Sequence, residues 1–232
     1  MISALTYEWR RITSIRSTWI LLGIIIILPV TVITIGLLLG QSVDPLSTTI
    51  FSLSAVGFLA AALGAQSLGQ EYRFGTIRVT LTTYPTRLFI FVAKLVVALG
   101  FTVVTGVVTI GLCLLIASLA GDPWQLTADA LAIAFRMVLI LAGWLLIGFG
   151  IAGLTRNTML GIVLPLVTVF VIEPLLLLTV IPKALWLAEL LPFNGNNALA
   201  TGWQAWRHLG VFGVWGVITT IAAYLRFAYR DA

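Results

Sequence analysis

Long apolar runs separated by short polar segments make up nearly the whole chain. Six of these runs are about 17 to 25 residues long, which is the length of an α-helix that crosses the hydrocarbon core of a membrane. Their approximate bounds are 19–40, 50–68, 95–120, 130–154, 159–180 and 209–225. The pattern predicts an all-α, polytopic membrane protein with about six transmembrane helices, built as a single domain over residues 1–232.

The segment before the first run has a helical periodicity of its own. Its apolar residues recur at spacings of three and four, which places them on one face of a helix: Ile2, Leu5, Trp9, Ile12 and Ile15. Arg10 and Arg11 fall off that face. This arrangement is typical of a helix that lies in the membrane interface, and it predicts an N-terminal interfacial helix.

The composition supports this reading. Of the 232 residues 60% are hydrophobic and only 9% are charged, whereas a soluble domain carries roughly 25% charged residues. The net charge of +5 is spread between apolar runs, which does not indicate nucleic-acid binding. Most basic residues fall in segments that would share one side of the membrane: Arg10, Arg11, Arg16, Arg73, Arg78, Arg87, Lys94, Arg156, Arg226 and Arg230. Both termini are therefore expected in the cytoplasm of a bacterial cell, with the chain in its plasma membrane.

Several patterns associated with catalysis are absent or misleading. Residues 148–153 match G-x-G-x-x-G, but they lie inside an apolar run without the strand that a dinucleotide site needs, so we interpret them as helix packing. A Walker A loop needs a Gly-Lys pair, and Lys94 and Lys183 follow alanine and proline. The single His208 and the single Cys113 offer no metal cluster or triad. The chain is not expected to be an enzyme or to bind a cofactor.

Two charges lie inside apolar runs, where a charge costs at least about 2.5–3.5 kcal/mol. They are Arg136 and Glu173, on runs that would be adjacent and antiparallel. Their depths, counted from the inner end of each run, differ by little more than the reach of one side chain. We expect an intramembrane ion pair between them, with separate snorkelling as the alternative. Pro174 weakens the helix at this point, as at a hinge.

The most polar stretch of the first half, residues 70–94, combines charges with aromatic residues. Gly75 and Thr76 favour the start of a short helix with Thr76 as its N-cap, and Pro85 would end it. A second helix would begin at about Thr86 and continue into the third apolar run. A short helix against the membrane surface is well placed to contact a soluble partner, although an ordinary loop with snorkelling arginines would give a similar pattern.

Three segments carry a resemblance to a known family. Glu71-x-x-x-Gly75-Thr76, followed by Leu81, Pro85, Arg87 and Lys94, resembles the segment after the second span of ABC-2 type transporter permeases. The stretch from Glu8-Trp9-Arg10-Arg11 to Arg16-Ser17-Thr18-Trp19 resembles the lead-in to the first span of actinobacterial members, and Glu173-Pro174 resembles their fifth span. The spacing from Pro85 to Arg87 is one residue shorter than the usual family pattern.

The resemblance implies a permease subunit of an ATP-driven ABC exporter. Two permease subunits, identical or homologous, would form the membrane part, and a separate nucleotide-binding subunit would bind ATP and Mg²⁺. Residues between the second and third spans would form a cytoplasmic coupling helix that contacts this ATPase: Glu71, Tyr72, Arg73, Gly75, Thr76 and Arg78. The alternatives are a membrane scaffold or accessory subunit that transports nothing and an ion-coupled transporter. The sequence indicates no particular substrate.

Overall fold

The computed structural model describes residues 2–39, 45–83, 86–120, 128–179, 189–193 and 202–230. Every regular element within those ranges is a helix, which confirms the predicted all-α class. The elements are α1 (Ile2–Ser14), α2 (Arg16–Leu38), α3 (Pro45–Arg73), α4 (Ile77–Thr83), α5 (Arg87–Leu119), α6 (Ala128–Thr155), α7 (Thr158–Val167), the π-helix η1 (Thr168–Ile172), α8 (Glu173–Thr179) and α10 (Gly202–Arg230).

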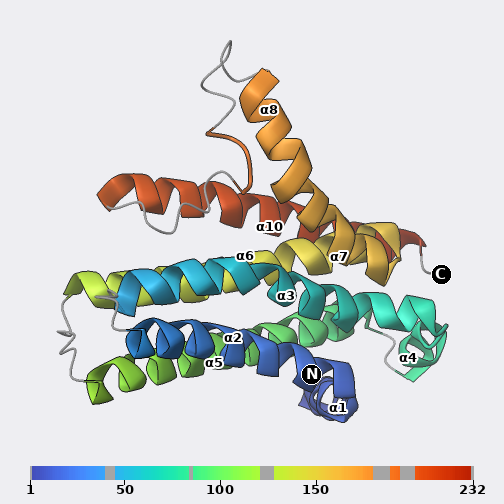
Figure 1. The fold of residues 1–232 in the computed structure, drawn as a ribbon. Helices are drawn as coiled ribbons and strands as arrows, with labels where there is room; N and C mark the ends of the chain where they lie inside the picture. The colour runs from blue at the N-terminus through green and yellow to red at the C-terminus, as the bar shows by residue number, and fades with distance from the viewer. Residues whose placement is uncertain are drawn as a thin grey trace.

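Five helical stretches in the described residues are long and apolar enough to cross a membrane. They are Arg16–Leu38, Arg87–Leu119, Ala130–Thr155, Thr158–Thr179 and Trp203–Tyr229. These stretches match five of the six predicted spans and support a multi-pass membrane protein. The predicted second span, 50–68, falls within α3, which packs along α6 in the centre of the bundle (Figure 1).

The helices extend beyond the bounds that hydropathy gave. We expected the third span to begin at about residue 95, but α5 begins at Arg87 after Thr86, so Lys94 lies about two turns inside the helix. The last helix likewise runs from Gly202 to Arg230 rather than from 209 to 225. Hydropathy detects where the side chains become polar, whereas the backbone hydrogen bonds of a helix continue through charged residues that have partners.

Gly64 and Gly148 allow α3 and α6 to approach closely. A Cβ on Gly148 would lie 2.1 Å from the carbonyl oxygen of Ala61, and a Cβ on Gly64 would lie 2.2 Å from that of Leu145. No side chain larger than hydrogen fits at either position. Residues 148–153 therefore form a helix-packing surface, because Gly150 and Gly153 also pack closely, against α10.

The fifth apolar run is divided into α7, η1 and α8. The π-helix ends immediately before Glu173-Pro174. Proline lacks a backbone N–H, so it disrupts the normal hydrogen-bond ladder of the preceding turn. The helix is therefore distorted just before Pro174 but stays continuous from Thr158 to Thr179, and its α8 end rises away from the remaining helices (Figure 1).

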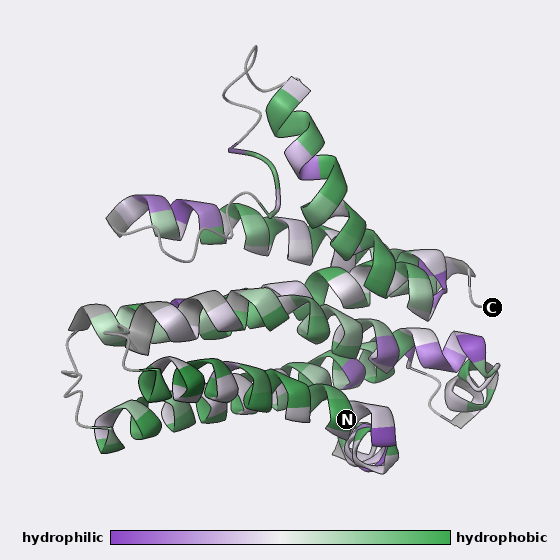
Figure 2. Cartoon of the chain, viewed as in Figure 1, coloured by the Kyte–Doolittle hydropathy of each residue, from purple (hydrophilic) through white to green (hydrophobic). Residues whose placement is uncertain are grey.

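Polar residues are frequent at the end of the bundle that carries α1 and α4, and some also lie at the opposite end of α10 (Figure 2). The end with α1 and α4, which we call the polar end, also carries the C-terminal end of α10 (Figure 1). The helix α1 lies across the bundle rather than along it, and it joins α2 through the single extended residue Ile15. The polar end is therefore where charged side chains from distant parts of the sequence meet.

Candidate functional site

Four charged side chains from three helices form a closed ring at the polar end. Lys94 on α5 donates from Nζ to Oε1 of Glu8 on α1, at 2.6 Å, and to Oε1 of Glu71 on α3. Arg11 on α1 donates from Nε to Oε2 of Glu8 at 2.8 Å, and its Nη1 lies 3.4 Å from Oε1 of Glu71. Acids and bases alternate, so each charge has two neighbours of opposite sign. We call this group the charge ring.

The charge ring is buried. The side chains of Glu8 and Lys94 are fully buried, that of Glu71 is 3% exposed and that of Arg11 is 14% exposed. Removing charges from water is costly unless each is paired and hydrogen-bonded. The two glutamates balance the two cations, so the ring has a formal charge of zero and satisfies that condition as a unit.

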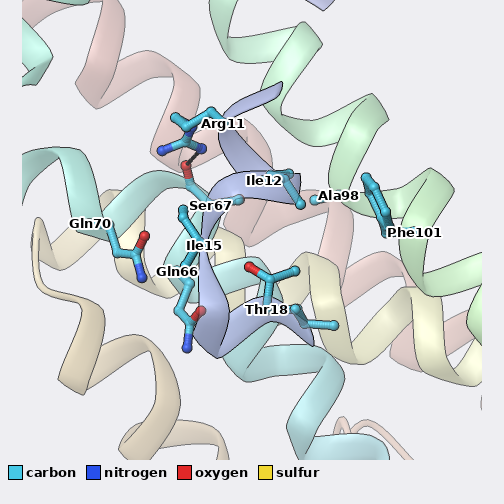
Figure 3. A pocket seen from close by; sticks show the side chains of 10 residues that line it. Arg11, Ile12, Ile15, Thr18, Gln66, Ser67, Gln70, Ala98 and Phe101 are labelled. Carbon is cyan, nitrogen blue, oxygen red and sulfur yellow. Dashed lines mark hydrogen bonds between the residues drawn. The ribbon is translucent and has the colours of Figure 1, made fainter. Parts of the chain in front are cut away.

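Local geometry places these four residues together. Glu8 and Arg11 lie three residues apart on α1 and therefore share one helical face. Glu71 lies in the last turn of α3, and Lys94 lies two turns into α5. Arg11 also donates from Nη2 to the carbonyl oxygen of Ser67 on α3, across a small pocket below the junction of α1 and α2 (Figure 3).

The buried face of α1 differs from the predicted apolar face. Ala4, Glu8 and Ile12 are buried against the bundle, whereas Trp9 is 56% exposed and stacks on Phe101 with ring centroids 4.8 Å apart. Sequence periodicity put Arg11 off the apolar face, and the structure places its guanidinium in the charge ring. A hydropathy pattern does not detect such paired charges on the buried side of a helix.

The predicted contact residues fall into two groups. Glu71 is buried in the charge ring, and Tyr72 is partly buried with its ring 5.8 Å from the guanidinium carbon of Arg156. Arg73, Gly75 and Thr76 are exposed. The side chain of Arg78 lies outside the described residues. A soluble partner therefore has direct access to the turn but not to Glu71.

Two backbone hydrogen bonds shape this turn. The N–H of Phe74 donates to the carbonyl of Gln70 at 2.9 Å, and that of Gly75 donates to Tyr72 at 3.3 Å. Gly75 has φ +68°, a left-handed conformation that favours glycine at the end of a helix. The helix α4 begins directly after Thr76 and ends at Thr83, as the sequence predicted. Residues 73–76 are called the exposed turn below.

Arginines close the ends of neighbouring helices beside the charge ring. Nη1 of Arg87, at the start of α5, donates to the carbonyl of Ala228 at 2.6 Å. Nη1 of Arg226 donates to the carbonyl of Leu154, at the end of α6. The last carbonyl groups of a helix have no partner within it, so these guanidinium groups satisfy them. The contacts tie α5, α6 and α10 together at the polar end.

Arg136 and Glu173 are both buried, at 9% and 4% exposure. The guanidinium carbon of Arg136 lies 5.8 Å from the ring centroid of Trp206. Oε1 of Glu173 accepts a hydrogen bond from the backbone N–H of Phe193 at 2.8 Å, which holds the 189–193 segment against α8. The ion pair between the two stays a prediction.

Sequence reasoning missed the structural roles of Glu8 and Lys94. Lys94 was placed at the membrane boundary, although its neighbours Ala93 and Leu95 are apolar and a helix start was expected eight residues earlier, at Thr86. A lysine eight residues after a helix start lies two turns inside the helix, and this spacing could have indicated that Lys94 enters the bundle.

Comparison with known proteins finds no matching protein-family model and no matching curated protein.

Proposed function

We propose that this chain is the permease subunit of an ATP-driven ABC exporter, and that it pairs with a second permease subunit and with a separate nucleotide-binding subunit. The observation that carries the proposal is the exposed turn, which projects from the polar end while its base, at Glu71, is fixed in the buried charge ring. A rigid base with an accessible tip is suited to receiving force from a soluble partner.

The surface next to the exposed turn supports a protein contact. Phe74 is 68% exposed and Val79 is 67% exposed. Apolar side chains on the body of the bundle can face lipid, but Val79 lies on α4 and Phe74 lies in the turn before it, at the polar end (Figure 1). Exposed apolar groups rimmed by polar residues are typical of binding surfaces, and the guanidinium carbon of Arg73 lies 5.5 Å from the ring centroid of Phe74.

The proposal includes α3 as a sixth span, with α4 and both termini in the cytoplasm. The helix α3 packs along α6, which is itself long and apolar enough to cross a membrane. Its charged residues Glu71 and Arg73 are confined to its last turn. The excess of arginine at the polar end then satisfies the positive-inside rule.

In this proposal the exposed turn and α4 form the coupling helix, and the ATPase binds them. ATP binding and hydrolysis change the geometry of the ATPase pair, which binds one arrangement of the permease more tightly than another. Such differential binding shifts the population between inward-facing and outward-facing states. The chain itself contributes no catalytic residue and no ATP or Mg²⁺ ligand.

Co-purification tests the proposal. The first step is to find an adjacent reading frame that encodes a Walker A ATPase; its product is then expressed together with the chain, and the complex is isolated through a tag on the permease. We expect the two to co-purify, with Phe74→Ser reducing recovery of the ATPase. Tyr229→Ser is the matched control, because Tyr229 is an 81% exposed aromatic residue at the same end.

Two results would overturn the proposal. One is transport by vesicles that contain the permease alone, which would favour an ion-coupled transporter. The other is labelling of Phe74→Cys in whole cells by a reagent that does not cross the membrane, which would invert the topology. Co-purification without any ATP-dependent transport would favour an accessory subunit.

A further inference from the structure

The helix α1 is joined to the rest of the chain by a minimal hinge. It ends at Ser14 and α2 begins at Arg16, so the single residue Ile15 connects them, with φ −89° and ψ 115°. A hydrogen bond from Nε1 of Trp19 to the carbonyl oxygen of Thr13, at 2.8 Å, also crosses this junction. The angle between α1 and α2 further depends on what holds α1 elsewhere. The charge ring joins α1 to α3 and α5.

Lys94 connects two other helices within the ring. Its single ammonium group binds carboxylates from two different helices, Glu8 on α1 and Glu71 on α3. Glu71 precedes the exposed turn by two residues, so the same cation joins α1 to the base of the turn. Because Lys94 is fully buried, water does not compete for these contacts.

The ring is least complete at Glu71. Its contact with Arg11, at 3.4 Å, is longer than the 2.6 Å and 2.8 Å contacts that hold Glu8. Within the described residues Oε2 of Glu71 is buried without a hydrogen-bond partner. Glu71 makes both of its ring contacts through Oε1, whereas Glu8 uses both of its carboxylate oxygens. Glu71 is therefore held closely by Lys94, and its second oxygen is the ring atom that can take a further donor when the last turn of α3 moves.

We infer that Glu8, Arg11, Glu71 and Lys94 act together as a positioning device that makes α1 move with the exposed turn. A displacement of the last turn of α3 changes the contacts at Glu71 and is passed through Lys94 to α1, which pivots at Ile15. Glu8 and Lys94 are thus positioning residues that act through Glu71. The inference rests on the proposed function for the source of the force, but the mechanical link is a property of this chain alone.

The link is tested by spin labels on both sides of the ring. Cysteines replace Arg10 on α1 and Thr76 in the exposed turn, both exposed, in a Cys113→Ala background, and pulsed electron paramagnetic resonance measures their separation in detergent and in lipid nanodiscs. A single narrow distance distribution is expected for the intact ring. The pair Glu8→Gln with Lys94→Met removes one anion and one cation and leaves Arg11 facing Glu71, so the protein stays charge-balanced.

That double variant should broaden or shift the distribution, because α1 then loses its contact with Lys94 and is held less firmly against the exposed turn. Thr109→Val, at another buried polar position on α5, is the matched control and should leave the distribution unchanged. An unchanged narrow distribution in the double variant would overturn the inference. If the double variant is not recovered as a folded protein, the exchanges described next decide the question.

Variants that change the order of the charges distinguish a four-membered ring from a single ion pair. The exchange Glu71→Lys with Lys94→Glu preserves the net charge, but it sets like charges beside each other next to Glu8 and next to Arg11. Reversal of all four residues restores alternation. We expect the fourfold reversal, and not the twofold exchange, to recover a monodisperse protein with the narrow distribution. Recovery by the twofold exchange would show that only the Glu71–Lys94 pair matters and would overturn the inference.

These measurements need no ATPase, so they are independent of the proposed function. If no ATPase binds but the distances respond as expected, the proposed function fails and the link stands. If the ATPase binds both forms and the distances stay fixed, the link fails and the proposed function stands. Where both hold, the double variant should keep its ATPase but lose the stimulation of ATP hydrolysis by the permease.

Discussion

Lys94 and Glu8 lie 86 residues apart in the sequence, yet Nζ of the lysine lies 2.6 Å from Oε1 of the glutamate and neither side chain is exposed. Glu71 binds the same ammonium group from a third helix. A buried charge pair often adds little net stability, because desolvation offsets the attraction. Its usual effect is to fix one arrangement of the helices, and here it fixes α1 across the end of the bundle.

Removing the ammonium group of Lys94 should destabilise the fold strongly. Lys94→Met leaves two buried carboxylates with Arg11 as their shared partner, and breaking such a buried network costs about 3–5 kcal/mol. Thermal unfolding in detergent, followed by tryptophan fluorescence, should show a lowered Tm. Arg10→Met removes an exposed cation that lies on α1 outside the ring, and it should leave the Tm nearly unchanged. A Tm for Lys94→Met equal to that of the control would contradict the burial of the ring.

The crossing of α3 and α6 should not tolerate a methyl group. Gly148→Ala would place its Cβ against the backbone of Ala61, and overpacking of this kind costs about 1–3 kcal/mol or more when backbone must move. Recovery of monodisperse protein on size-exclusion chromatography should fall. Gly23→Ala is the control, since open space surrounds that position on α2. Normal recovery of both variants would mean that the two helices are further apart than described.

The exposed turn should depend on the left-handed conformation of Gly75. A Cβ at φ +68° costs roughly 1–2 kcal/mol, so Gly75→Ala should weaken the turn and its binding to a partner. Asparagine tolerates this conformation, so Gly75→Asn should retain more of the binding than alanine does. Recovery of the co-purified ATPase measures the difference. The prediction fails if alanine is tolerated as well as asparagine.

Glu173 offers a test of two roles. If its main role is to accept a hydrogen bond from the N–H of Phe193, Glu173→Gln should be tolerated because the amide retains a carbonyl oxygen, whereas Glu173→Leu should lower the Tm. If it also pairs with Arg136, each single reversal should lower expression, and Arg136→Glu combined with Glu173→Arg should restore it. Expression levels in membranes distinguish these outcomes. Failure of the double reversal to restore expression counts against the pair.

The local patterns of the sequence predicted helices well. Apolar runs located all of the long helices, because burial in lipid is a property of about 20 consecutive side chains that one can read without a fold. Gly75-Thr76 correctly predicted where α4 begins, because the residues that favour a helix start act within a single turn. The prediction of which site residues are exposed to a partner was less accurate. Glu71 was grouped with exposed residues, but its helix continues into the bundle and buries it.

The sequence alone determined the class of the protein, the positions of its helices and the small residues through which they pack. Those properties follow from interactions within one or two turns of the chain. Only the tertiary structure decided which face of α1 is buried and that Glu8, Arg11, Glu71 and Lys94 meet in one ring. A sequence lists charges but not their partners, and pairing between segments 86 residues apart depends on how the helices are folded together.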